Sequence, residues 1–535
     1  MSAFLISSAM VSADAEESDA DDSESDDQEP EHIYVDDGDF NYRLENGYAV
    51  AVQYNGVDDE VSIPEKMTYE GTSYTVWEIE CVAFFQNEPS RVIIPKTVEN
   101  LWAPMALSDS LRNIDVDPAN PKYASRDGVL YDKDFSSLIK YPNGKPDESF
   151  AVPESVVTIE SSAFNESKLK SISTGDKVRI ISDYAFSGCT QLSGFNEKDG
   201  INYLPDRLHL IGYAAFRGCS SLEQITFPFT LNTIGEKCFY ESGLKTVELW
   251  YDVTMVGDGA FARCANLTSI QIEGSERYRS YEGMLYEIET GSSRSGNILV
   301  SYPAAREDTV YSFPSDVHSM RPLAFAGCTH LEEVRMSDAI KGVSDSAFLE
   351  CTGLKKVVLT DSVTSIDDMA FSGCTSLSEV VWSDRLSEIG YMSFAKTGFT
   401  KLVLPDNLRI MGPFCFEDCP GLVTAVLPGG LKNLGMMTFH ECYKLERVTV
   451  GSNSTNFENS ALSVGTHEHT EKTGENVHIT VKAPKNFHIP ENVSGDYTDI
   501  DWDIEGDRPY PYENLAGVLI CILVLFGITR MFREA

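Results

Sequence analysis

The sequence predicts a mainly β solenoid of about 13 coils, each 22–23 residues long and each carrying short parallel strands. An aromatic residue recurs along the 535-residue chain, and from Phe325 to Phe439 its steps are 23, 23, 23, 22 and 23 residues. An apolar segment with the pattern Leu-x-x-Val-x-Leu precedes this aromatic in unit after unit. Because a unit this short cannot bury its own apolar face, the units are expected to stack into one continuous core.

Residues 354–376, LKKVVLTDSVTSIDDMAFSGCTS, form one complete unit. Leu354, Val357 and Leu359 alternate at the end of a β-branched run, which predicts a short strand. The hexapeptide AFSGCT closes this unit at 370–375 and occurs again, unchanged, at 185–190. Stacked units place such strands in parallel about 4.8 Å apart.

Two segments precede the solenoid. Residues 1–13 contain a short apolar run followed by Val-Ser-Ala, which predicts a signal peptide that lacks its basic start, the alternative being a merely apolar N-terminus. In 14–31, 11 of 18 residues are Asp or Glu and none is Lys or Arg, so we expect a disordered acidic spacer.

The C-terminal segments predict a membrane anchor. Residues 451–509 are expected to form a cap and a stalk, and 515–528 is an uncharged apolar run. That run has 14 residues, so a helix crossing the bilayer needs 510–532, with Arg530 reaching the interface. Aromatic residues before the run and arginines after it place the body outside and 533–535 in the cytoplasm. A buried core helix is the alternative.

The repeat resembles the BspA-like leucine-rich repeat surface proteins, the leucine-rich repeat type 5 family. The resemblance is carried by LVLPDNLRIMGPFCFEDC at 402–419 and LHLIGYAAFRGC at 208–219. It implies a leucine-rich repeat solenoid over 81–450, an N-terminal β cap over 32–80, and hairpin insertions near 120–150 and 278–312. Both insertions carry Gly-x-Leu-Tyr followed by Tyr-Pro, which is also typical of the family.

Eight of the 12 cysteines occupy one phase of the repeat, three residues after the aromatic. Ser, Thr or Asn replaces the cysteine in other coils, and a disulfide partner would not be exchanged in that way. Parallel Cβ vectors about 4.8 Å apart also suit a disulfide poorly. We therefore expect a buried structural row of thiols; scattered disulfides, catalysis or metal binding are the alternatives. The row comprises Cys189, Cys219, Cys264, Cys328, Cys351, Cys374, Cys419 and Cys442.

Other chemistry finds little support in the sequence. His467 and His469 lie in an expected polar loop without the spacing of a zinc helix. Residues 501–507, DWDIEGD, begin like a calcium loop but place Tyr512 where a bidentate Glu is needed, so a strand of a C-terminal cap is favoured. No nucleotide, zinc-protease or serine-hydrolase motif is present, and we expect neither a cofactor nor an enzyme. A hydrolase using a hidden carboxylate pair is the least favoured alternative.

The surface offers two further predictions. The formal net charge of −41 argues against nucleic acid and anionic lipid as partners. Four Asn-x-Ser/Thr sequons are candidate glycosylation sites or plain surface residues: Asn165, Asn266, Asn453 and Asn492.

One column of the predicted strands is a candidate binding surface. The residue before the last apolar position of each strand is expected to point out of a concave sheet. This column is polar in the first coils and then reads Arg335, Val358, Val381, Val403 and Val426. An exposed apolar stripe is typical of an interaction site, but valine also favours strands for its own reasons.

These observations predict a membrane-anchored cell-surface protein that binds a macromolecule, in the manner of an adhesin. The family resemblance implies a protein or a matrix component as the partner. A structural envelope spacer with no specific ligand is the main alternative.

Overall fold

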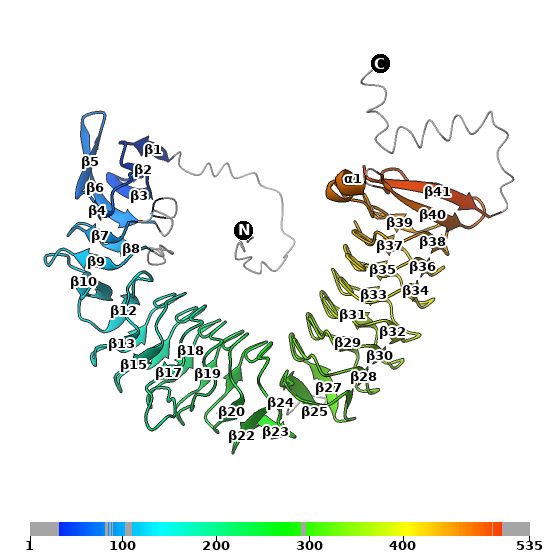
Figure 1. Ribbon diagram of the computed structural model, residues 1–535, viewed down its shortest axis with the longest axis horizontal. Helices are drawn as coiled ribbons and strands as arrows, with labels where there is room; N and C mark the ends of the chain where they lie inside the picture. Colours follow the sequence, from blue (N-terminus) through cyan, green and yellow to red (C-terminus); the bar gives the residue numbers. More distant parts are fainter. Residues whose placement is uncertain are drawn as a thin grey trace, which may run out of the picture.

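The protein is a curved solenoid whose coils stack from the N-terminal to the C-terminal end of the arc (Figure 1). The computed structural model describes residues 32–80, 84, 87, 89–101, 110–289, 296–473, 475–494 and 496–505. The predicted signal peptide, acidic spacer and membrane anchor lie outside these residues. No helix among the described residues has the length and apolar character needed to cross a membrane. The predicted mainly β solenoid of many coils is confirmed.

A mixed sheet, with antiparallel pairs and two parallel pairs, covers the N-terminal end of the stack. Its order is β1-β2-β3-β6-β5, and β8 pairs with β6 on the side of the first coil. The strands are β1 (Ile33–Asp36), β2 (Phe40–Glu45), β3 (Tyr48–Tyr54), β5 (Lys66–Tyr69), β6 (Thr72–Ile79) and β8 (Asn100–Leu101).

Most coils contribute two short strands, and these strands build two separate sets of sheets, which are parallel except within the hairpin insertions. The set with mostly two-residue strands follows the inner side of the curve (Figure 1). In the N-terminal arm its order is β10 (Tyr123–Arg126), β11 (Val129–Asp132), β12 (Ser137–Lys140), β14 (Thr158–Ile159), β16 (Ile180–Ile181), β18 (Leu210–Ile211), β19 (Thr233–Ile234) and β21 (Met255–Val256). In the C-terminal arm it is β29 (Gly342–Val343), β31 (Ser365–Ile366), β33 (Glu388–Ile389), β35 (Ile410–Met411), β37 (Asn433–Leu434) and β39 (Asn456–Phe457).

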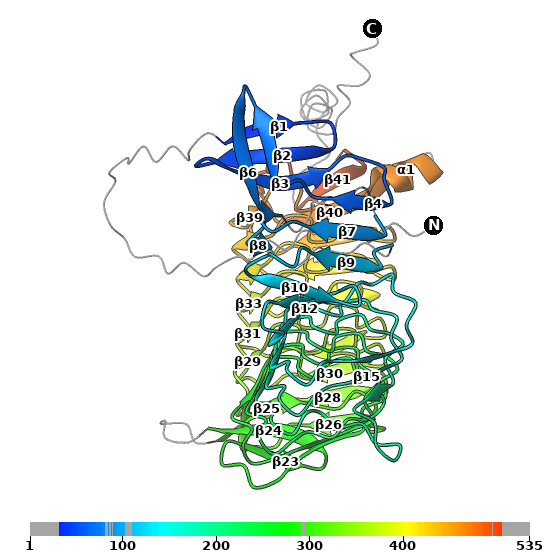
Figure 2. The same cartoon turned by 90° about the vertical axis from the view of Figure 1, so that its left-hand side faces the viewer.

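The second set contains the Leu-x-x-Val-x-Leu strands and follows the outer side of the curve (Figure 1). Figure 2 shows it beside the first set, with β28 and β30 to the right of β29 and β31. It is divided into short groups, as expected where neighbouring coils fan apart. The first groups are β4 (Glu60–Ser62), β7 (Arg91–Ile94) and β9 (Asn113–Val116); β13 (Ser149–Ala151), β15 (Ser171–Ser173) and β17 (Gly194–Phe195); and β20 (Thr246–Leu249) with β22 (Ser269–Ile272). The later groups are β26 (Val310–Ser312), β28 (Glu333–Arg335), β30 (Lys356–Val358) and β32 (Glu379–Val381); and β34 (Lys401–Val403), β36 (Thr424–Leu427), β38 (Arg447–Val450), β40 (Val477–Ala483) and β41 (Thr498–Ile504).

The prediction that the Leu-x-x-Val-x-Leu strands line the concave face was therefore wrong. The inner sheet stays continuous from β29 to β39, whereas the outer sheet is interrupted between β32 and β34. Continuous hydrogen bonding between all coils requires close strand spacing, which the inner side of a curved stack provides. The pattern of one repeat does not show which of its two strands lies on the inner side.

A stack of phenylalanine rings runs through the core. In the N-terminal arm the rings of Phe164, Phe186, Phe216 and Phe239 lie 4.9–5.1 Å apart and within 11° of parallel. In the C-terminal arm the stack from Phe325 to Phe439 has steps of 4.5–6.1 Å. The recurring aromatic of the sequence is thus the central column of the core.

Each ring is carried by a turn that we call the Ala-Phe turn, running from the second residue after an inner strand to the cysteine position. The ring residue donates its backbone N–H to the next coil, as from Phe186 to the carbonyl of Ala215 at 2.7 Å. The residue two positions before the ring has a positive φ, as in Phe414 at 58°. The second residue after the ring also does, and Gly188 and Gly373 supply this conformation in the AFSGC copies without the cost of a Cβ.

The two hairpin insertions each start a ring stack. Tyr141 and Tyr302, from the two Tyr-Pro motifs, lie 5.3 Å from Phe164 and 4.9 Å from Phe325. The second insertion forms the sheet β23 (Tyr278–Tyr281), β24 (Met284–Glu289), β25 (Gly296–Ser301) and β27 (Val317–Met320). The tyrosines replace phenylalanine because each hydroxyl reaches a carboxylate, Asp147 or Asp308, at 3.0 Å.

The C-terminal end departs from the prediction in one respect. Residues 467–469 were expected in a loop, but they begin the helix α1 (His467–Thr473). Two ion pairs spaced four residues apart, His467 with Glu471 and Lys472 with Glu468, support this helix of 7 residues. Ile500, Trp502 and Ile504 lie in strand β41, as their alternation indicated.

Replacing Phe371 by Ala should destabilise the solenoid by about 3–5 kcal/mol, because it removes a fully buried ring from the middle of the stack. The measurement is urea unfolding followed by circular dichroism. Tyr251→Ala, which removes an exposed ring, is the control and should change stability by less than about 1 kcal/mol. Equal losses for the two variants would contradict the central role of the stack.

Candidate functional site

The eight cysteines predicted as a structural row all lie buried in the Ala-Phe turns. Seven of their thiols donate to the carbonyl oxygen of the ring residue in the preceding coil at 3.0–3.4 Å, as from Cys374 to Phe348 at 3.1 Å. Cys328 approaches the carbonyl of Tyr302 at 4.0 Å. The cysteine therefore satisfies a backbone acceptor between two stacked coils.

Thr397 takes the cysteine position in one coil, but its hydroxyl donates to the carbonyl of Phe394 in its own coil, at 2.8 Å, and not to the preceding coil. Cys238 and Cys415, in the slot before the ring, are also free and buried. Burial raises the pKa of Cys189 to about 12 and that of Cys264 to about 11, so both thiols stay protonated at neutral pH.

The four sequons lie at different degrees of exposure. Asn266, Asn453 and Asn492 are exposed, whereas Asn165 is half-buried. The Asn453 side chain donates to the carbonyl of Lys485 at 3.0 Å.

The valine column points to solvent from the outer sheet. The pairs Val358–Val381 and Val403–Val426 lie directly opposite each other on neighbouring strands. Val381 and Val403 are 44% and 49% exposed, and Val358 and Val426 are half-buried. Arg335 lies opposite Val358 and forms an ion pair with Glu333 at 2.7 Å. The column is thus an apolar strip on the convex side.

Sequence reasoning missed a second row of surface side chains, on the Ala-Phe turns. In the C-terminal arm the rings of Tyr391 and Phe414 lie 5.9 Å apart, and the ring of His440 lies 6.3 Å from Phe414. In the N-terminal arm the rings of Tyr184 and Tyr213 occupy the same turn positions, 5.1 Å apart. These residues lie two or three positions before the ring, or in His440 one position after it, so no single column of the repeat contains the whole row.

A third apolar surface lies on two neighbouring coils, in the segments that lead from the outer side to the inner strands β19 and β21. Phe229 and Tyr251 are each 55% exposed, and Phe229 contacts Trp250 at 4.5 Å between ring centroids. Trp250 donates its indole N–H to the carbonyl of Phe227 at 2.9 Å, which fixes this ring to the coil.

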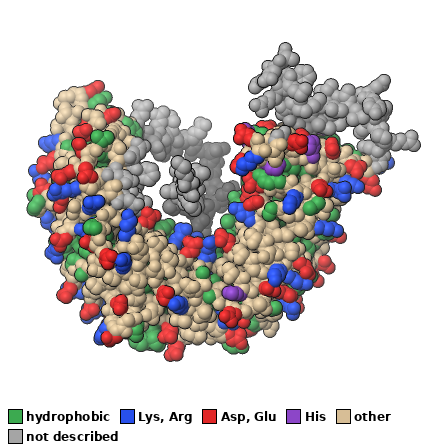
Figure 3. Space-filling model, in the orientation of Figure 1, with side chains coloured by type: hydrophobic (Ala, Val, Ile, Leu, Met, Phe, Trp, Pro, Cys, Tyr) green, Lys and Arg blue, Asp and Glu red, His purple; other side chains and the backbone are tan. Residues whose placement is uncertain are grey.

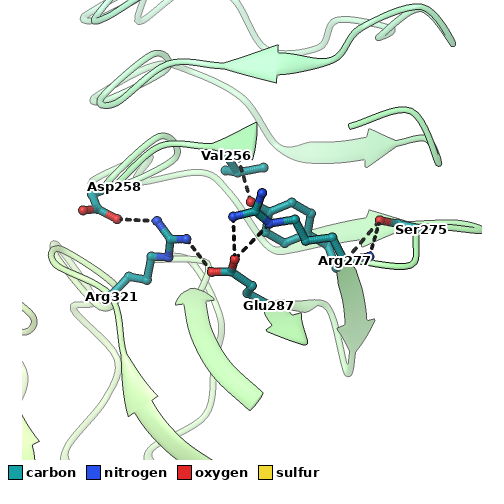
Figure 4. Close-up of polar contacts among 7 residues, drawn as sticks. Val256, Asp258, Ser275, Arg277, Glu287 and Arg321 are labelled. Carbon is teal, nitrogen blue, oxygen red and sulfur yellow. Dashed lines mark hydrogen bonds and ion pairs between the residues drawn. The ribbon is translucent and has the colours of Figure 1, made fainter. Parts of the chain in front are cut away.

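The best-buried charged cluster joins the two arms. The carboxylate of Glu287 in β24 accepts hydrogen bonds from Arg321 and Arg277, and Arg321 also contacts Asp258 at 2.9 Å (Figure 4). Burial favours the neutral acid, but the two guanidinium groups outweigh it and lower the pKa of Glu287. Because every member is paired, this cluster clamps the second insertion onto the coils on either side of it and offers no free acid or base.

Two carboxylates do share one surface cavity. Glu197 and Glu223 line an open cavity of about 590 Å³ with Asn202 and Lys245. Glu223 is paired with Lys245 at 2.6 Å, and the Asn202 amide bonds three backbone groups. Within the described part of the chain, no three His, Cys, Asp or Glu side chains are placed to hold a metal ion. Figure 3 shows acidic and basic side chains interspersed over the visible face.

The thiol row should resist modification. In the native protein the ten described cysteines should fail to react with iodoacetamide at pH 8, because they are buried and the reagent cannot reach them. Alkylation in 8 M urea should label them all, which peptide mass spectrometry can check. Rapid native labelling of Cys189 or Cys374 would contradict a buried structural role.

Lys140 predicts a specific pH dependence. Its side chain is 2% exposed, and burial lowers its pKa to about 8. The folded chain then binds fewer protons than the unfolded chain between about pH 8 and the usual lysine pKa near 10.5, so stability gains up to about 3 kcal/mol as pH rises through this window. Lys140→Met should lose this gain in urea unfolding at pH 8 and pH 10. Lys122→Met, at an exposed site, should keep it, and identical pH profiles for the two variants would refute the effect.

Comparison with known proteins identifies the repeat. A model of the "BspA type Leucine rich repeat region" matches six copies, over residues 147–208, 201–284, 308–420 and 341–468, more than half of the chain. No curated protein sequence matches this chain.

Solved structures of similar chains are bacterial. A leucine rich cell surface protein from Faecalibacterium prausnitzii is 22% identical, with 82% of this chain and 97% of that chain covered and a TM-score of 0.45. The pneumococcal vaccine antigen PcpA is 18% identical, with coverage of 89% and 99% and a TM-score of 0.48. A leucine-rich repeat protein from Eubacterium ventriosum is 22% identical, with coverage of 64% and 92% and a TM-score of 0.48. Likenesses at this level support no conclusion about partners.

Proposed function

Because the chain belongs to the BspA type leucine rich repeat family, we propose that it is a cell-surface protein whose solenoid binds a macromolecular partner. The partner is a protein or a matrix component, and nucleic acid is disfavoured by the net charge of −41. The C-terminal segment 510–532 anchors the chain in the membrane as a single helix, with the solenoid outside the cell.

One observation carries the proposal: the valine column is exposed on a sheet whose opposite face already forms the core. Val357 and Leu402, the neighbours of Val358 and Val403 in their strands, are buried, so the fold does not need these outward valines to be apolar. A strip of paired valines gives a flat apolar surface, and exposed apolar surface of this kind is typical of interaction sites. A spacer without a ligand has no need of such a strip.

The double variant Val358→Lys with Val403→Lys should abolish binding without unfolding the chain, because it places two charges in the apolar contact. Binding is measured by capture of the full chain on immobilised matrix and cell-surface extracts, with circular dichroism as the test of folding. Thr226→Lys with Gln271→Lys, which adds the same charge to the polar part of the column, is the matched control. Undiminished capture of a folded valine variant would defeat the proposal.

A further inference from the structure

We propose that the Ala-Phe turns of the C-terminal arm form a second binding surface, which takes a lysine- and arginine-rich segment of a partner protein. This surface is separate from the valine column, because it follows the inner strands whereas the valines lie on the outer sheet. The inference therefore stands or falls independently of the partner bound by the outer face.

The apolar part of this surface is a row of side chains on three successive coils. Tyr391 and Phe414 meet nearly edge to face, at 74°, and His440 continues the row at 88° to Phe414. Tyr391 is 41% exposed, and Ile410 and Met436 beside the row are 40% and 37% exposed. Burial lowers the pKa of His440, so its ring is neutral at pH 7 and adds no positive charge. The row presents ring faces and edges to solvent.

Carboxylates surround this row. On the same and adjacent turns, or on the inner strand just before them, they are Asp367, Asp368, Glu388, Glu417, Asp418 and Glu441. None of them has an ion pair with a Lys or Arg side chain among the described residues 296–473. Partial burial and the charge of Glu441 raise the pKa of Glu417, and partial burial and neighbouring carboxylates raise that of Asp367. Glu417 and Asp367 thus lie among like charges, and the charge of Lys396 only partly opposes this effect at Glu417.

The N-terminal arm differs from the C-terminal arm in having Lys and Arg side chains over its rings. There the chain supplies its own cations to the rings at the same turn positions. The ammonium of Lys237 lies 5.8 Å from the ring of Tyr213, and the guanidinium groups of Arg217 and Arg263 lie 5.5 and 5.7 Å from the ring of Tyr240. Tyr240 and His440 both directly follow the stacked ring of their coil. No such cation–ring contact involves Tyr391, Phe414 or any other ring between residues 384 and 460 of the described chain.

A cationic polypeptide fits both parts of the surface. Its Lys and Arg heads can lie over the exposed rings and among the carboxylates, and their aliphatic stems can cover Ile410 and Met436. Anionic partners would be repelled by the same carboxylates. A single metal ion would need a cluster of three ligands, which the described residues do not provide.

The test uses the full chain and a fluorescein-labelled nonapeptide of alternating arginine and serine, with its glutamate counterpart as a negative probe. Fluorescence anisotropy gives Kd at 50 and 200 mM NaCl. Tyr391→Ala with Phe414→Ala should raise Kd about tenfold, because each exposed cation–ring contact contributes about 0.5–1 kcal/mol. The matched pair Tyr184→Ala with Tyr213→Ala, at the equivalent turns of the other arm, should change Kd less than twofold.

A second pair of variants separates this surface from the overall negative charge. Glu417→Gln with Glu441→Gln should raise Kd at least threefold and flatten its salt dependence, whereas Asp406→Asn with Glu446→Gln, on exposed sites outside the turns, should not. Equal effects of the two pairs, or equal effects of the two aromatic pairs, would overturn the proposal. If the double aromatic variant fails to fold, Tyr391→Ala alone serves, and an unchanged Kd for that folded variant would also overturn it.

Discussion

The stacking of one phenylalanine on the next determines the architecture of this protein. A single coil has short strands and one turn. Its ring is not buried, and its backbone groups are not hydrogen-bonded, until a second coil lies against it. The Ala-Phe turn brings these needs together: the ring stacks at about 5 Å, its N–H bonds the next coil, and the cysteine bonds the previous one. Each coil is therefore held on both sides, and exposed ends must be covered. The N-terminal sheet covers one end, and the longer strands β40 and β41 form the other.

The same constraint explains which parts of the repeat vary. The residue two positions before the ring has a left-handed backbone in coil after coil, yet it is Tyr184, Lys237 or Phe414 rather than glycine. A side chain in this conformation costs about 1–2 kcal/mol, so it persists where the packed turn enforces it. Some side chains at these places, such as Leu323, are buried, but others, such as Tyr184 and Phe414, are exposed or half-buried and can be used on the surface. The two arms use them differently: the first balances rings with its own cations, and the second surrounds rings with carboxylates.

The second insertion joins the two arms of the solenoid. Where the second hairpin interrupts the regular repeat, the ring stack passes from Phe261 to a new start at Tyr302, and the buried pair of Glu287 with Arg321 bridges the discontinuity. The polar clamp lies where the two largest apolar clusters meet. Such fully paired charges contribute less net stability than an apolar contact would, but they fix one geometry between the two arms.

The sequence by itself determined the coil length, the positions of the ring and the cysteine within the coil, and the two insertions. This is possible because each buried position of a stacked repeat recurs once in every coil. It also indicated that Val358 and Val403 point to solvent, since strand alternation is a local property. Only the tertiary structure decided that these valines lie on the convex side, because the curvature arises from unequal spacing of two sheets along the whole stack. Local pattern also failed at His467, where ion pairs one helical turn apart stabilise a short helix. The row formed by Tyr391, Phe414 and His440 exists only through stacking, which brings residues 23 and 26 positions apart into contact.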